Sequence, residues 1–285
     1  LYISFLIVFL SYLFHIPDIS IALYIIATVF LIFRRSFITI TYSPKLLIYI
    51  LGIIIIHFLY LYGSYDLSFQ NWDAVVSWNA WASQLFDNNH FPQVNIYPIL
   101  LPSIWSLIYK AQGDYTLWIF AKSSLLVVYF LLILSFALLY RVNKRLSIFF
   151  IIANFLFLAV IHEKYLFSGL MDIPVMLFML TGLTLLILNL YHYQLDNSSQ
   201  RFINSLFYIS IVFSLASITK QAGLLTLLMY VICLSYFLFT KVISRVVFYK
   251  NLFILLLPFI LFLIMFLNAT VPSDIIGNLS QLRKM

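Results

Sequence analysis

The sequence has little charge, one cysteine and no glycine-rich phosphate loop, and each shortage excludes a class of protein. Only 9% of its 285 residues are charged, whereas a soluble domain carries about 25%, so the chain could not build a water-exposed surface. The single cysteine, Cys233, excludes an intramolecular disulfide. Metal-spaced His or Cys sets and helix-borne His pairs are also missing, so the common nucleotide and metal motifs do not apply.

Apolar residues dominate what is present. They make up 64% of the chain, and the mean hydropathy is +1.07. They form runs of about 15 to 24 residues, which as helix cross a hydrocarbon core of about 30 Å. The alternating pattern of membrane barrel strands is absent. We therefore predict an all-α polytopic membrane protein, one transmembrane domain over 1–285, with about nine spans: 1–14, 19–33, 46–62, 117–140, 146–161, 173–193, 202–218, 224–239 and 252–267.

The net charge of +7 comes from basic residues in short links between the apolar runs. This pattern is typical of cytoplasmic loops rather than of a nucleic-acid surface. The positive-inside rule places four links in the cytoplasm: 34–45, 141–145, 194–201 and 241–250. Alternation then places 63–116, 162–172 and 219–223 outside, and these segments hold most of the acidic residues, including Asp73, Glu163 and Asp172.

The long outside segment 63–116 contains two predicted interfacial helices. The first covers 71–86, with Asn71 as N-cap and Asp73 in the first turn, where the helix dipole favours a carboxylate. Its apolar face is formed by Val75, Trp78, Trp81, Ala82 and Leu85. We expect this helix at the membrane surface, with tryptophans at headgroup depth and Asp73 facing the protein. Simple capping is the alternative role for Asp73. The second helix, over 99–109, is too short to span.

Cationic residues recur at the predicted outer ends of the spans. The three lysines at these positions are Lys122, Lys164 and Lys220. His162 and Glu163 directly precede Lys164. Ionisable residues at membrane depth are costly and tend to be functional, and lysines can bind phosphate as point charges. Each lysine alone could instead snorkel to the headgroups. Asp172 precedes Ile173 and Pro174, so it is either a helix cap or a second carboxylate near Asp73.

These residues give the chain a resemblance to the GT-C superfamily of membrane glycosyltransferases, which includes protein mannosyltransferases and bacterial aminoarabinose transferases. Members carry an acidic residue early in the first large extracytoplasmic loop, where this chain has WDAVVSWNAWA with Asp73. YPILLP, SGLMDIP and SITKQAGLL also resemble segments at matching places. Many members have an Asp-Glu pair in this loop, whereas Ala74 follows Asp73 here. Full enzymes are usually longer, so the chain is either a compact member or truncated at one or both ends.

The resemblance implies an inverting transfer of a sugar from a polyprenyl-phosphate donor to a glycan, lipid or protein acceptor. Asp73 would be the general base, and Lys122, Lys164 or Lys220 would stabilise the leaving phosphate. The remaining residues expected to contact the substrates are Trp72, Asn79, Tyr97, His162, Glu163 and Asp172. No cofactor beyond the lipid-linked sugar is implied, and the use of a divalent metal is left open. The expected location is a bacterial inner membrane, with the site facing the extracytoplasmic side.

Three other functions fit parts of the pattern. A transporter or lipid flippase would also have intramembrane charges, but more often at mid-bilayer on broken helices with internal repeats. An O-antigen polymerase or ligase would more often carry its large loop late in the chain, with arginines in it. A non-catalytic subunit of a glycan-assembly complex would explain the missing glutamate.

Overall fold

The computed structural model describes most of the chain from residue 44 onward. The described residues are 44–62, 72–87, 99–116, 118–161, 168–196 and 199–270, with Ile3, Leu6, Ile7, Ile26 and Phe69. Their regular secondary structure is entirely helical, which confirms the all-α class for this part of the chain. The helices are α3 (Pro44–Tyr62), the π-helix η2 (Ala74–Asn79), α4 (Ala80–Asp87), α5 (Leu100–Gln112), α6 (Trp118–Leu138), the 3-10 helix η3 (Leu139–Arg141), α7 (Lys144–Ile161), α8 (Asp172–Asp196), α9 (Ser199–Ser217), α10 (Gly223–Phe239) and α11 (Arg245–Thr270).

The predicted spans from 46–62 onward each coincide with one long helix: α3, α6, α7, α8, α9, α10 and α11. The first two predicted spans, 1–14 and 19–33, lie almost wholly outside the described residues. Within the described residues, three helices are long and apolar enough to cross a membrane: Trp118–Leu138, Asp172–Leu195 and Arg245–Ile264. A crossing by each of the other helices stays a prediction.

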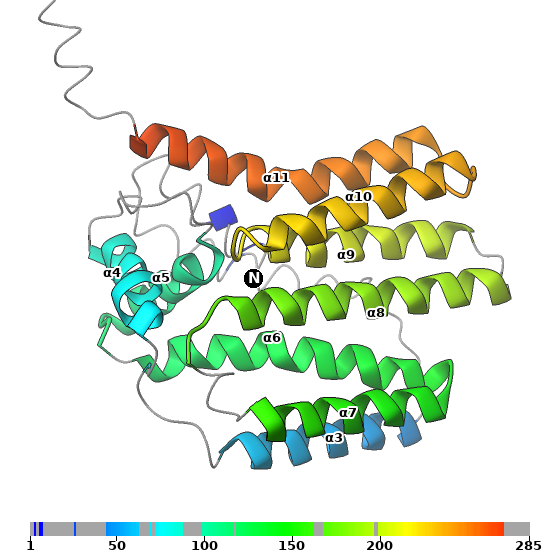
Figure 1. The fold of residues 1–285 in the computed structure, drawn as a ribbon, viewed down its shortest axis with the longest axis horizontal. Coiled ribbons are helices and arrows are strands. Elements are labelled where there is room, and N and C mark those ends of the chain that lie inside the picture. Colours follow the sequence, from blue (N-terminus) through cyan, green and yellow to red (C-terminus); the bar gives the residue numbers. More distant parts are fainter. Residues whose placement is uncertain are drawn as a thin grey trace, which may run out of the picture.

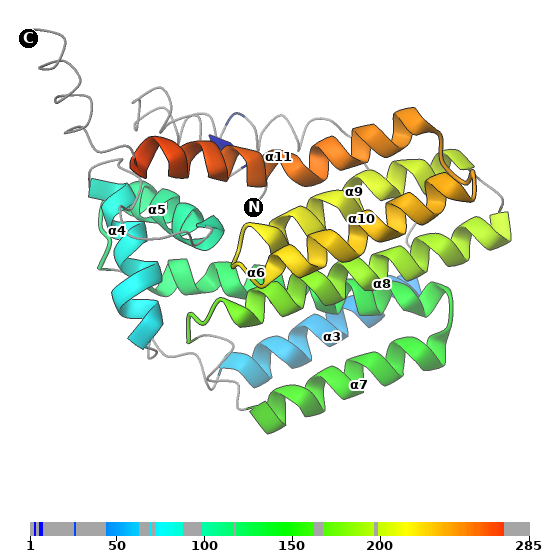
Figure 2. The ribbon, with the colours of Figure 1, turned by 45° about the horizontal axis from the view of Figure 1, so that its top comes forward.

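The long helices lie side by side, so their connections fall at two opposite ends of the bundle (Figures 1 and 2). We call one the basic end; it carries the α6–α7, α8–α9 and α10–α11 links, with Lys144, Arg201 and Lys241. We call the other the site end; it carries the starts of α6 and α8, the 218–223 turn between α9 and α10, and helices α4 and α5. This separation agrees with the alternation of basic and acidic links in the sequence. Which end faces the cytoplasm is a prediction of the positive-inside rule.

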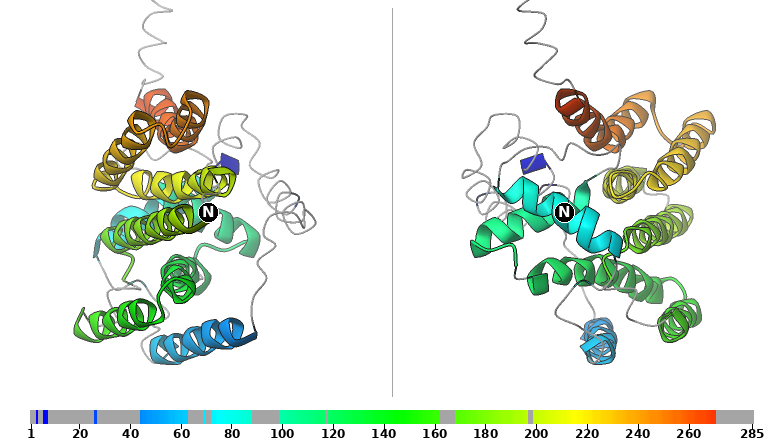
Figure 3. Two further views of the ribbon diagram at one scale, coloured as in Figure 1. Left: turned by 90° about the vertical axis from the view of Figure 1, so that its right-hand side faces the viewer. Right: turned by 60° about the vertical axis from the view of Figure 1, so that its left-hand side comes forward.

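The bundle exposes apolar side chains on its outer helices. In the end views of Figure 3, α3 and α7 lie at one side of the bundle and α10 and α11 at the opposite side. Leu225 and Phe239 of α10 are 67% and 84% exposed, and Ile48 of α3 is 70% exposed. Large exposed apolar surfaces mark contact with a partner or a membrane. Because these surfaces belong to apolar helices of near-spanning length, a hydrocarbon surrounding accounts for them best.

A small polar cluster joins three of the helices that lead to the site end. The Ser210 hydroxyl of α9 donates to Asn251 Oδ1 of α11 at 2.9 Å. The Tyr230 hydroxyl of α10 donates to the Leu206 carbonyl of α9 at 3.1 Å. In a bilayer, burial of apolar surface does little to drive helices together, because lipid tails are equally apolar. Hydrogen bonds between helices then help to hold the bundle together. The cluster therefore fixes α9 against α10 and so helps to set the position of the turn that joins them.

Candidate functional site

The segment with Asp73 is helical from Trp72 to Asp87, with the π-helix η2 in its middle. The predicted apolar face is confirmed: Trp78, Trp81, Ala82 and Leu85 are buried and Val75 is half-buried. This face, however, packs into the protein core with α5 rather than into lipid headgroups. Trp78 and Trp81 thus contact protein rather than lipid, because a second amphipathic helix covers them, and their depth relative to a membrane stays a prediction.

Asp73 and Trp72 lie on the exposed side of this segment. Trp72 is 76% exposed, and Asp73 is also exposed, so the expectation that Asp73 faces inward is not met. The π-helix begins at the next residue, Ala74. Such wide turns are rare and occur often at functional sites. The exposed carboxylate is therefore accessible to a ligand from outside the bundle.

Helix α5 lies behind this segment and is buried along most of its length. The Trp105 indole N–H donates to Ser124 Oγ of α6 at 2.9 Å, which ties α5 to the bundle. The Tyr109 hydroxyl donates to Asn79 Oδ1 of η2. Burial raises the pKa of Tyr109, so its hydroxyl keeps its proton for this bond at ordinary pH. Asn79, a predicted substrate contact, is 6% exposed and acts here as a structural acceptor.

A tight turn before α8 packs directly against the start of the Asp73 segment. Gly169 in this turn has φ +85°, a conformation that side chains with a Cβ rarely adopt. A Cβ added to Gly169 would lie 2.4 Å from Ala74 Cβ and 3.0 Å from Phe69 Cδ1. The turn therefore approaches Ala74 as closely as glycine allows. This contact places the neighbourhoods of Asp73 and Asp172 next to each other, and neither Phe69 nor Gly169 was singled out from the sequence.

The α9–α10 turn completes the convergence. The backbone N–H of Leu100, at the start of α5, donates to the Ile218 carbonyl at 3.0 Å. Two residues further on, Lys220 Nζ donates to both carboxylate oxygens of Asp172, at 2.9 and 2.7 Å. Two predicted site residues from separate outside segments are thus brought into direct contact. The side chains are 28% exposed for Lys220 and 60% for Asp172, so both charges remain accessible.

Separate neutralisation of Asp172 and Lys220 is expected to cost little stability. Exposed ion pairs contribute about 0 to 1 kcal/mol, so Asp172→Asn, Lys220→Gln and the double variant should each lower the unfolding free energy by less than about 1 kcal/mol. Unfolding of the purified variants in detergent, analysed as a double-mutant cycle, gives the coupling energy. A coupling above about 2 kcal/mol would instead indicate that this pair acts as a buried structural link between α8 and the turn.

Lys122 differs from Lys220 in being fully buried. It lies near the start of α6 and is 1% exposed, so the alternative of snorkelling to the headgroups is wrong for this lysine. Ser124, which accepts the Trp105 hydrogen bond, is two residues further along the same helix. A buried ammonium is retained only where polar or charged groups compensate its desolvation. Lys122 therefore belongs to the packed interior between α5 and the bundle.

Four other predicted site residues, Tyr97, His162, Glu163 and Lys164, lie outside the described residues. Among the described residues, no group of three or more His, Cys, Asp or Glu side chains could hold a metal ion. Metal dependence therefore stays an open part of the prediction. The predicted catalytic and phosphate-binding residues that the structure describes are therefore exposed Asp73, buried Lys122 and Lys220, of which Lys220 is paired with Asp172.

The segments that carry the family resemblance meet at the site end. WDAVVSWNAWA contacts SGLMDIP through Ala74 and Gly169, and YPILLP bonds to SITKQAGLL through Leu100 and Ile218. The Asp172–Lys220 pair then joins SGLMDIP to SITKQAGLL. Comparison of the chain with protein-family models, with curated proteins and with solved structures finds no match in any of the three.

Proposed function

We propose that the chain is a GT-C-type membrane glycosyltransferase that moves a sugar from a polyprenyl-phosphate donor to an acceptor at the site end. One observation carries the proposal: four short segments, singled out from the sequence for their resemblance to the family, converge through the Ala74–Gly169 contact, the Leu100–Ile218 hydrogen bond and the Asp172–Lys220 pair. Any bundle of side-by-side helices gathers alternate links at one end, so the support comes from the specific contacts there, above all the direct pairing of Asp172 with Lys220.

The exposed Asp73 carboxylate suits the role of general base. It would take the proton from an acceptor hydroxyl or amine as that group attacks the anomeric carbon. The bond from this carbon to the phosphate oxygen breaks, the configuration inverts, and the lipid phosphate leaves with the bonding electrons. An acceptor could reach Asp73 from solution or from the membrane surface, because the side chain lies on the outer side of its helix.

The lysines of the site would stabilise the charge that develops on the leaving phosphate. Lys220 is held by Asp172 at 2.7 Å with its side chain partly exposed, so a phosphate could bind the same ammonium from its open side. Lys122 would act from the interior, through the field of a buried cation. The lipid tail of the donor would lie against the apolar outer helices and enter sideways from the bilayer. The site end would then face the extracytoplasmic side of a bacterial inner membrane, as the basic links at the other end favour.

Transfer of labelled sugar tests this function directly. The purified protein in lipid vesicles is supplied with a mixture of glycan, lipid and protein acceptors and a panel of polyprenyl-phosphate sugars, and a parallel reaction receives the same acceptors with the matching nucleotide sugars. We expect transfer from a lipid-linked donor only. Transfer from nucleotide sugars would contradict the lipid-donor mechanism. If no donor in a broad panel supports transfer, the protein is better explained as a transporter, a flippase or a non-catalytic subunit of a glycan-assembly complex.

A further inference from the structure

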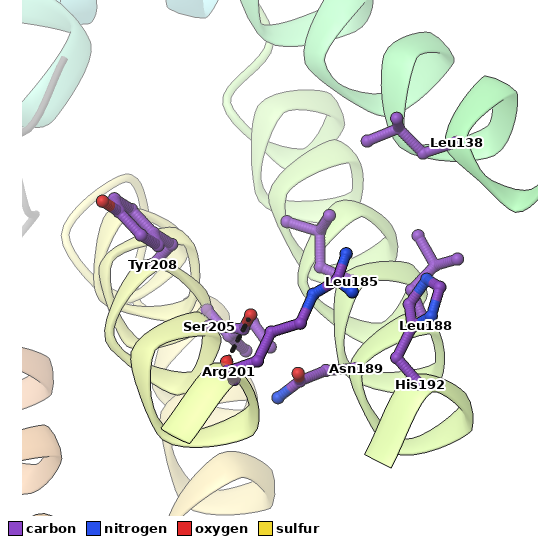
Figure 4. Close-up of a pocket in the computed structure, with 9 residues that line it drawn as sticks. Leu138, Leu185, Leu188, Asn189, His192, Arg201, Ser205 and Tyr208 are labelled. Carbon is purple, nitrogen blue, oxygen red and sulfur yellow. Dashed lines mark hydrogen bonds between the residues drawn. The ribbon is translucent and has the colours of Figure 1, made fainter. Parts of the chain in front are cut away.

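A cavity at the basic end is separate from the site described above. It lies between the end of α8 and the start of α9 and is bounded by the end of α6 (Figure 4). Its volume is about 250 Å³. The residues that define its character are Leu138, Leu185, Leu188, His192, Arg201 and Ser205. The cavity therefore combines an apolar floor, a cationic side chain, an imidazole and a hydroxyl.

Arg201 is the central polar residue of this cavity. Figure 4 shows its side chain extending from α9 toward α8, with its guanidinium beside Leu185. The backbone that carries it is held by two hydrogen bonds: Ser205 Oγ donates to the Arg201 carbonyl at 3.0 Å, and Asn189 Nδ2 of α8 donates to the Phe202 carbonyl at 3.0 Å. Asn189 is 6% exposed, so the second bond is a buried connection between the two helices. The position of Arg201 is thus set by both helices.

The lining selects a particular class of ligand. A guanidinium binds phosphate oxygens through a fork of parallel N–H donors. The leucines beside the guanidinium make no favourable contact with a fully hydrated anion. They can instead pack against the apolar part of a lipid next to its headgroup. A cavity of about 250 Å³ is slightly below the range of about 300 to 1,000 Å³ that encloses a drug-sized ligand. It therefore has room for a phosphate headgroup.

The position of the cavity agrees with a lipid ligand. The apolar span of α8 runs from Asp172 to Leu195, and His192 is in the last turns of that span. Arg201 is in the first turn of α9, just beyond that span. The cavity therefore lies at the boundary between the apolar part of the helices and the charged link. Basic pockets between membrane helices at the cytoplasmic surface bind anionic headgroups. The basic end is the one that the positive-inside rule assigns to that surface.

We propose that this cavity binds the phosphate of an anionic phospholipid from the leaflet at the basic end. Arg201 pairs with the phosphate, with His192 and Ser205 at its side, and the first acyl carbons lie over the leucines. This site is independent of the sugar-transfer site, because it lies at the opposite end of the long helices.

Lipid binding to purified variants tests the proposal. Retention of phosphatidylglycerol and phosphatidylcholine is measured by native mass spectrometry of the full chain released from detergent. We expect preference for phosphatidylglycerol, and Arg201→Gln should weaken its binding by about tenfold, the loss that follows from one charge-assisted hydrogen bond. Arg245→Gln is the matched control, since Arg245, like Arg201, is an exposed arginine at the same end of the bundle but does not line the cavity. The Arg245→Gln variant should change binding by less than about threefold, because a charge outside the cavity acts on the bound lipid only at a distance.

A second variant keeps the charge and fills the cavity. Leu185→Trp should also reduce phosphatidylglycerol binding while Arg201 is unchanged, because the added ring occupies the space beside the guanidinium. Equal binding of the two lipids would overturn the proposal, and so would equal losses in Arg201→Gln and Arg245→Gln. Displacement of the lipid by millimolar inorganic phosphate would also overturn it, in favour of a soluble phosphate ligand.

Discussion

Replacing Asp73 by asparagine is expected to abolish sugar transfer and to leave the protein folded. Asparagine has the same shape but cannot take a proton from the acceptor, and a positioned general base contributes about 10² to 10⁴ in rate. Asp73 is exposed, and exposed substitutions usually change stability by less than about 0.5 kcal/mol. The transfer assay and an unfolding curve on the same preparation separate the two effects.

Asp87→Asn is the matched control for this variant. Asp87 is also exposed and ends α4, the helix that continues from the Asp73 segment, but it has no predicted role in catalysis. The Asp87→Asn variant should retain the full sugar-transfer activity of the parent protein. Activity of Asp73→Asn within about threefold of the parent, far inside the 10² loss expected of a missing base, would remove Asp73 from the mechanism. Loss of activity in both variants would indicate instead that transfer depends on the total negative charge of this segment and not on a base at position 73.

Replacing Gly169 by alanine is expected to disrupt the site through its contact with Ala74. The new methyl would lie 2.4 Å from Ala74 Cβ, and φ of +85° is unfavourable for alanine. The conformation costs about 1 to 2 kcal/mol, and overpacking adds about 1 to 3 kcal/mol. We therefore expect a loss of about 2 to 5 kcal/mol in unfolding free energy, with transfer activity lost as the Asp73 segment is displaced.

Gly113→Ala isolates the conformational part of this cost. Gly113 ends α5 with φ +73°, and a Cβ there would meet nothing within 4 Å. Its substitution should cost only about 1 to 2 kcal/mol and leave transfer in place. The difference between the two variants then measures the contact between the turn and the Asp73 segment.

The pair Ala74→Gly and Gly169→Ala provides a further check by rescue. Removing the Ala74 methyl relieves the shortest contact, so the double variant should recover at least about 1 kcal/mol relative to the sum of the single variants. Recovery of transfer should accompany it. If the two substitutions are simply additive, the turn and the Asp73 segment are not in the contact that the structure describes.

Long apolar runs made the helices readable from the sequence. Every predicted span from 46–62 onward coincides with a helix, because a run of that length has no other way to satisfy its backbone in a bilayer. A short helix over 99–109 was also predicted from the prolines of YPILLP. The observed α5 continues to Gln112, because Gly113 ends it in the left-handed conformation. The separation of basic and acidic links followed from alternation alone.

The details of the site depended on contacts between distant segments, which a sequence pattern does not contain. Periodicity identified the buried face of the Trp72–Asp87 helical segment, but it could not say whether protein or lipid covers that face. Nothing in SGLMDIP indicates that Gly169 approaches Ala74, because both the positive φ and the short distance arise from packing. The Asp172–Lys220 pair likewise required two turns to be placed together.

The spread of the site along the chain has a consequence for biogenesis. Its contacts join Ala74 to Gly169, Leu100 to Ile218 and Asp172 to Lys220. Helices of a membrane protein are made in order from the N-terminus, so the Asp73 segment and α5 are synthesised long before the turn that holds them. During that interval their buried faces have no complete protein partner. These contacts are therefore complete only once α9 and α10 have both been made, and a chain that ends before Lys220 lacks the partner of Asp172.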